Sequence, residues 1–166
     1  GLRGAAAASA YGSALTLSID SDDATFQSQA LVRFDGIIGT AAGLIPPGSL
    51  IDSAALGLQV FNSGSGLRAH RMLTVWSDAS TWNTLGNGVQ ADGIEAELAA
   101  SGSLGADNGS ANVPTGARAV TVTSAVQAWA DGSTNHGFVL LPFPSGTDGV
   151  EFYLSLIHIS EPTRPR

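Results

Sequence analysis

The 166-residue chain contains no cysteine, no lysine and no long apolar run. Without cysteine it forms no disulfides, thiolate nucleophiles or cysteine-ligated zinc sites. Its seven basic side chains are all arginines, and they are scattered along a chain with 14 acidic side chains. The sequence therefore has no basic stripe that could bind along the phosphate backbone of a nucleic acid. No segment approaches the roughly 18 apolar residues of a membrane span. We therefore expect no nucleic-acid partner and no membrane span.

Glycine and apolar residues make up much of the sequence. The chain holds 21 glycines and 43% hydrophobic residues, with a formal net charge of -7. This composition is too apolar for a disordered acidic segment, and the length suits one domain with a core. The N-terminus shows no secretory signal and has the character of an internal part of a longer polypeptide. We therefore expect other domains of the same parent polypeptide as partners.

Short alternating runs, separated by Gly, Pro, Asn, Asp and Ser, are typical of half-buried strands. They predict strands over residues 15–19, 30–35, 51–60, 67–76, 119–123, 137–143 and 150–153. The NSGSG segment between the third and fourth of these predicts a hairpin. Residues 83–116 alternate little, and only 94–100 is a candidate for a short helix or an edge strand.

One helix is predicted near residues 123–131, capped by Thr123 or Ser124 and ended by an Asp-Gly pair. Trp129 lies on its apolar face, which predicts core packing. Seven or eight short strands with one small helix indicate an all-β fold. We expect an antiparallel β-sandwich of jelly-roll type.

The sequence offers little material for catalysis. Before residue 154 it has only two histidines, His70 and His136, and no H-E-x-x-H, G-x-S-x-G or Walker-type motif. His70 lies on a predicted strand and His136 in a predicted turn, which favours structural roles for both. A pair of distant acids in a lectin-like cleft stays open as an alternative, but no spacing selects one. We expect a protein that is not an enzyme.

The SIDSDD segment is the one candidate for a metal site. Asp20, Asp22 and Asp23 place several carboxylates in a turn, and oxygen ligands of this kind suit calcium. The segment lacks the downstream glycine and bidentate glutamate of an EF-hand loop, so a solvated turn at a strand end is the default interpretation. A structural calcium remains the alternative, and no other cofactor is expected.

The alternate face of the strand predicted over residues 67–76 combines cationic, imidazole and aromatic side chains. Sugar recognition uses an aromatic plane against the apolar face of a pyranose ring, with fork-like donors for hydroxyls or carboxylates. The candidate ligand-binding residues are therefore Arg68, His70, Trp76 and Trp82. The alternative is that one or both tryptophans seal the end of the sandwich.

Several segments in order resemble the DNRLRE domain, which is also carbohydrate-binding module family 96. They are LRGAAAASAYGSALTLSIDSDD, LVRFDGI followed by IPPGSLIDSAALGLQV, WSDASTWN, TVTSAVQAWADGSTNHGFVLLP and GVEFY. The resemblance covers residues 2–153. It implies an extracellular, non-catalytic β-sandwich module of a larger secreted or cell-surface protein, with a polysaccharide as partner; some relatives bind alginate-type acidic glycans.

Two departures from the family pattern matter. Asp78 stands where the family often has glutamate, and the family's closing strand is replaced by the different segment that begins at residue 154. The acidic balance of the chain and its few arginines argue against an anionic glycan, since such a ligand would favour a cationic cleft. A neutral glycan, or a structural or adhesion spacer without glycan affinity, stays open.

The C-terminal segment changes character abruptly. Its first eleven residues, LSLIHISEPTR, resemble the frame translation of a transposase mosaic-end sequencing-library adapter. We therefore expect a domain over residues 1–153, truncated at both ends and lacking at least one natural strand, followed by a non-native tail over residues 154–166. The alternative is a natural apolar strand over residues 154–159 with a tail broken by prolines.

Overall fold

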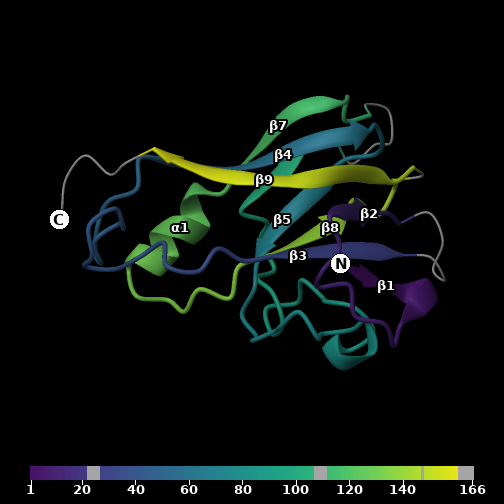
Figure 1. The fold of residues 1–166 in the computed structure, drawn as a ribbon, viewed down its shortest axis with the longest axis horizontal. Helices are drawn as coiled ribbons and strands as arrows, with labels where there is room; N and C mark the ends of the chain where they lie inside the picture. The colour runs from purple at the N-terminus through teal and green to yellow at the C-terminus, as the bar shows by residue number, and fades with distance from the viewer. Residues whose placement is uncertain (22–26, 107–111, 147, 161–166) are drawn as a thin grey trace.

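The part of the chain that the structure describes is an antiparallel β-sandwich of two sheets with a single short α-helix (Figure 1). The computed structural model describes residues 1–21, 27–106, 112–146 and 148–160, with side chains as far as residue 153. The strands are β1 (Leu2–Arg3), β2 (Thr16–Ile19), β3 (Ser28–Val32), β4 (Ser53–Asn62), β5 (Leu67–Arg71), β6 (Gly102–Leu104), β7 (Gly116–Thr121), β8 (Phe138–Pro142) and β9 (Val150–Ser160). The helices are α1 (Thr123–Ala130) and the single-turn 3-10 helices η1 (Gly4–Ala6) and η2 (Asn83–Leu85).

The strand order is that of a jelly roll. One sheet has the order β1-β3-β8-β5-β6 and the other β2-β9-β4-β7, and the strand pairs are antiparallel. If the eight strands from β2 to β9 are numbered one to eight, the order in the four-stranded sheet is 1-8-3-6. The order in the other sheet, without β1, is 2-7-4-5. This alternation between sheets is the double Greek key of a jelly roll, with β1 added at one edge. The predicted fold class is confirmed.

The inward face of each sheet follows the alternation read from the sequence. In β4, Ala54, Leu56, Leu58 and Val60 are buried, whereas Gln59 between them is exposed. They join one core between the sheets, to which α1 contributes Val126 and Trp129. Side chains of both sheets therefore interdigitate in a single apolar layer.

The hairpin predicted between residues 51–60 and 67–76 is wrong. Strands β4 and β5 belong to different sheets, so the NSGSG segment turns the chain from one sheet to the other. Local turn chemistry indicates that the chain reverses but does not specify the partner strand. The fourth strand is also shorter than predicted, because β5 ends at Arg71.

Helix α1 begins without the predicted cap. Neither Thr123 nor Ser124 caps the helix with its side chain; instead, the hydroxyl of Thr123 accepts a hydrogen bond from the backbone N–H of Ala54 at 3.0 Å. Gln127 holds the backbone of residues 49–51 with both ends of its amide. These side chains tie the helix to the segment that leads into β4, and this tertiary connection replaces the local cap.

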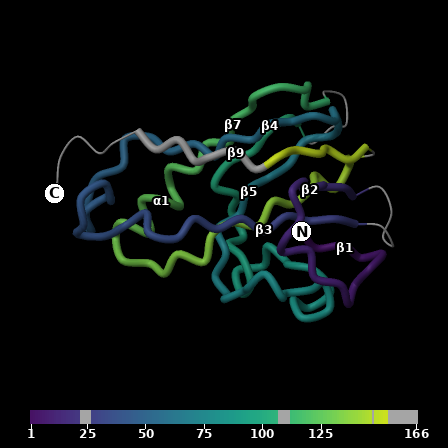
Figure 2. The backbone as a smooth tube through the Cα atoms, viewed as in Figure 1, coloured from purple at the N-terminus to yellow at the C-terminus, as the bar shows by residue number. Residues whose placement is uncertain are grey.

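The connection from β5 to β6 covers the outer face of the five-stranded sheet, which the tube in Figure 2 shows below β3 and β5. It contains no strand or α-helix over residues 94–100, only a bridge between Met72 and Ala96. Its side chains and the sheet form a second apolar cluster of Leu2, Leu31, Met72, Trp82, Val89, Ala96, Val139 and Leu141. His70, on the polar side of β5, is therefore buried rather than exposed.

Strand β9 continues to Ser160, past the predicted end at Tyr153. Its backbone pairs with β4 as far as Ser53 opposite Ser160. The non-native origin of residues 154–166 stays a prediction. None of the helices described is long and apolar enough to cross a membrane.

Candidate functional site

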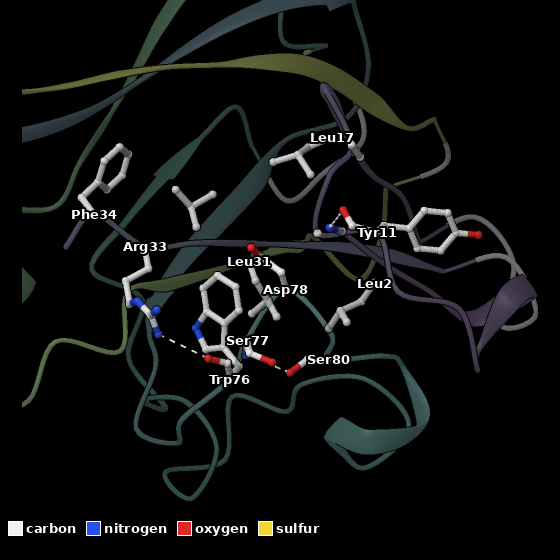
Figure 3. Close-up of a pocket in the computed structure, with 14 residues that line it drawn as sticks. Leu2, Tyr11, Leu17, Leu31, Arg33, Phe34, Trp76, Ser77, Asp78 and Ser80 are labelled. Carbon is white, nitrogen blue, oxygen red and sulfur yellow. Dashed lines mark hydrogen bonds between the residues drawn. The ribbon is translucent and has the colours of Figure 1, made fainter.

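A cavity of about 280 Å³ lies where the N-terminal segment, the end of β3 and the loop after β5 meet (Figure 3). We call it the Trp76 pocket. Its lining residues are Gly1, Leu2, Tyr11, Gly12, Ala14, Leu17, Leu31, Val32, Arg33, Phe34, Trp76, Ser77, Asp78 and Ser80. The pocket therefore combines apolar walls with an indole, a phenol, a guanidinium, a carboxylate and hydroxyls. A few polar groups in an apolar cavity are typical of small-ligand sites.

Trp76 is held from two directions. Its indole N–H donates to the carbonyl oxygen of His136 at 2.7 Å. The guanidinium of Arg33 donates to the carbonyl oxygen of Trp76 at 3.3 Å and lies 5.3 Å from the centre of the indole ring. This distance is within the range of a cation–π contact. The ring is thus oriented before any ligand arrives, which lowers the entropic cost of binding.

The Asn-His-Gly turn that receives the indole N–H is itself fixed to β3. The side-chain amide of Asn135 donates to the carbonyl oxygen of Phe34 at 2.9 Å and accepts from the backbone N–H of Gly137 at 2.9 Å. Gly137 has a φ of 77°, and a Cβ there would lie 2.2 Å from the carbonyl oxygen of Val32. Only glycine allows this close approach.

The loop that carries Trp76 also supplies polar groups to the pocket. The hydroxyl oxygen of Ser80 accepts a hydrogen bond from the backbone N–H of Ser77 at 3.0 Å. This bond closes a turn around the exposed Asp78. Gly12 packs directly on this turn, because a Cβ at Gly12 would lie 2.4 Å from the Cβ of Asp78. The N-terminal segment carrying Tyr11 is thereby held against the loop after β5.

A second cavity of about 460 Å³, the His70 pocket, lies over the outer face of the five-stranded sheet. It is lined by Ser21, Gln27, Gln29, Arg68, His70, Val89, Gln90, Ala91, Leu98, Leu141, Pro142 and Pro144. The amide of Gln29 makes two hydrogen bonds to the backbone of Val89, at 2.9 and 3.2 Å. Arg68 donates to the carbonyl oxygen of Pro142 at 3.3 Å and lies over the ring of Phe143.

His70 is only 1% exposed at the floor of this pocket. Its Nδ1 lies 2.8 Å from the carbonyl oxygen of Glu97, and a carbonyl only accepts, so Nδ1 carries the proton. Nε2 is buried and has no hydrogen-bond partner among the described residues. Burial lowers the pKa of His70 below its ordinary value of 6.5, and the nearby Arg68 charge acts in the same direction.

We expect this buried imidazole to destabilise the fold in mild acid. Because the pKa is lower in the folded state, the unfolded chain binds the proton first, so stability is lost as the pH falls below about 6.5. In His70→Asn the side-chain amide can still donate to the Glu97 carbonyl but does not titrate. Urea unfolding at pH 7 and pH 5 should show a smaller loss of unfolding free energy for this variant than for the wild type. Equal losses would show that His70 does not titrate in this way.

The four predicted ligand-binding residues do not form one face. Trp76 lines the Trp76 pocket, whereas Arg68 and His70 line the His70 pocket. Trp82 is 8% exposed and packs in the second apolar cluster, with Gly88 against its ring. The alternative of core packing therefore holds for Trp82.

Sequence reasoning missed Arg33 and Tyr11. Arg33 stands in an alternating run as one polar position among several, and its contact with Trp76 joins residues 43 positions apart. Tyr11 lies in a Gly- and Ala-rich segment outside any predicted strand. No local pattern marks either residue, because both are brought to the pocket by tertiary packing.

The predicted calcium site is only partly within the described residues. Asp20 follows the end of β2 and is bridged to Ser28, and a Cβ added at Gly149 would lie 2.7 Å from its carboxylate. Asp22 and Asp23 lie outside the described residues. In the part of the chain that is described, no group of three or more potential metal-binding side chains is found. The calcium site stays a prediction.

No family model matches the chain, and no curated protein matches it. The resemblance to the DNRLRE domain therefore stays a prediction based on the segments quoted above. Because one fold carries many functions, the jelly roll does not select a function either. The geometry of the Trp76 pocket is what supports a functional proposal.

Proposed function

We propose that the protein is a non-catalytic carbohydrate-binding module, and that the Trp76 pocket seats one sugar unit of a polysaccharide. The observation that carries this proposal is the pre-oriented indole of Trp76, fixed by His136 and Arg33 in a cavity that is also lined by a carboxylate and hydroxyls. The motif resemblance supports the same function.

The chemistry of the pocket suits a pyranose. A sugar ring has an apolar face of C–H groups, which packs on an aromatic plane, and a rim of hydroxyls that both donate and accept hydrogen bonds. Trp76 offers aromatic surface, and Asp78 and Ser80 offer acceptors for hydroxyl groups. Each type of group on the ligand thus has a counterpart.

The size of the pocket limits what it holds. Its volume of about 280 Å³ is at the lower end of the range for small-ligand sites, about 300–1,000 Å³. A single sugar unit, at a chain end or within a chain, suits this space better than a longer buried segment. Contacts limited to one unit give weak binding, so we expect avidity from other domains of the parent polypeptide to contribute.

An extracellular or cell-surface location belongs to the same proposal. The resemblance implies a secreted parent protein, and polysaccharides are the partners available there. A sequence without cysteine is compatible with this location, because the sandwich closes its core without disulfides.

A structural or adhesion spacer without glycan affinity is the second candidate function. The observation that favours it is that the main donors near the pocket already bond to protein acceptors. The Trp76 N–H bonds to His136, and the Arg33 guanidinium bonds to Trp76 and pairs with Asp35. In this interpretation the Trp76 contacts serve to fix the loop after β5.

Affinity electrophoresis separates the two candidates. We expect gels containing one of a panel of neutral and uronic-acid polysaccharides to retard the folded protein, and the Kd to follow from the polymer concentration that halves its mobility. Circular dichroism of the same sample controls for folding. A folded protein that no polymer retards would contradict glycan binding and support the spacer.

A further inference from the structure

We propose that Asp78 makes the Trp76 pocket selective for neutral sugar units over uronic acids. This inference rests on the proposed function and names the substrate class of the same site. It differs from the acidic glycans that some members of the resembled family bind. The argument comes from the charges that line the pocket and from the partners that those charges already have.

The cation of the pocket is already balanced. Arg33 is the only lysine or arginine that lines the pocket in the described part of the chain. Its Nε lies 2.9 Å from a carboxylate oxygen of Asp35, and its Nη1 donates to the Trp76 carbonyl. A uronate that bound Arg33 would have to compete with Asp35 at close range. The guanidinium therefore contributes shape and a cation–π contact more than attraction for an anion.

The carboxylate of Asp78, in contrast, has no partner of opposite charge in an ion pair among the described residues. Asp78 is exposed at the lining and forms no hydrogen bond or ion pair through its side chain with another described residue. A carboxylate can accept two hydroxyl groups of a neutral sugar. It repels the carboxylate of a uronic acid placed in the same cavity, since like charges within a few ångströms are unfavourable even in water.

The test uses matched ligands that differ at one carbon. Methyl glycosides of glucose, galactose and mannose are compared with the corresponding methyl uronides by NMR titration at low salt, following the indole N–H of Trp76. In the wild type we expect the neutral member of the bound pair to have the lower Kd, by about 3- to 10-fold. In Asp78→Asn, which keeps the shape of the side chain, this ratio should fall close to one.

The control variant is Asp148→Asn, which removes the same charge from an exposed loop residue outside the pocket lining. It should keep the wild-type ratio, which separates a local effect from one of net charge. Uronides that bind the wild type as tightly as neutral glycosides, or an unchanged ratio in Asp78→Asn, would overturn the inference while glycan binding stands. If no glycoside moves the Trp76 signal, the proposed function fails, and the inference fails with it.

Discussion

Replacing Trp76 by alanine should weaken binding to the retained polysaccharide by about 30-fold, or about 2 kcal/mol. Truncation removes the aromatic plane from the pocket and with it the ring over which Arg33 lies. It also leaves the His136 carbonyl without the indole donor. The measurement is the Kd from affinity electrophoresis, compared with wild type at the same salt concentration.

Two further variants make this result specific. Trp76→Phe keeps an aromatic plane but loses the bond to His136, so we expect intermediate affinity. Phe61→Ala removes an exposed aromatic side chain on β4 of the four-stranded sheet, where it packs against Tyr153 outside the Trp76 pocket. This variant should leave binding unchanged. Wild-type affinity in folded Trp76→Ala would refute the assignment of the pocket.

Replacing Gly137 by alanine should destabilise the fold by about 3 kcal/mol or more. The new Cβ would lie 2.2 Å from the Val32 carbonyl oxygen and 2.8 Å from the Cβ of Arg33, in a residue with a φ of 77°. These contacts are with the last residue of β3 and the residue after it, so this segment or the turn has to move. Urea unfolding followed by circular dichroism measures the change in the free energy of unfolding.

Gly132→Ala is the matched control for this substitution. Gly132 also has a positive φ, of 103°, but a Cβ there meets no atom within 4 Å. The control therefore carries the conformational penalty alone, of about 1–2 kcal/mol. If Gly137→Ala costs no more than Gly132→Ala, the close approach to β3 does not constrain the turn.

The sandwich is largely predictable from the sequence, because alternation reports which side of a strand is buried. The alternating pattern of β4 gives its inward face correctly, and the apolar face of α1 places Trp129 in the core. The pairing of strands is less predictable. The NSGSG turn has hairpin chemistry but joins two sheets, since the partner of each strand is decided by distant segments.

The candidate site is less predictable than the fold. The pattern of β5 marks Arg68 and His70 as a polar face, but it carries no sign that His70 is buried beneath the connection to β6. Trp76 is found from its residue type, because an aromatic side chain beside polar ones suggests sugar binding. Its partners Arg33 and His136 come from the residue after β3 and from the turn before β8, and only the tertiary structure brings them together.

The most direct test of the central claim is an NMR titration of the protein with the polysaccharide that retards it, or with oligosaccharides cut from that polymer. The chain has three tryptophans, so three indole N–H signals report on three places at once. We predict saturable movement of the Trp76 signal with little change at the buried Trp82 and Trp129. Saturable binding that leaves the Trp76 signal in place would contradict the assignment of glycan binding to this pocket.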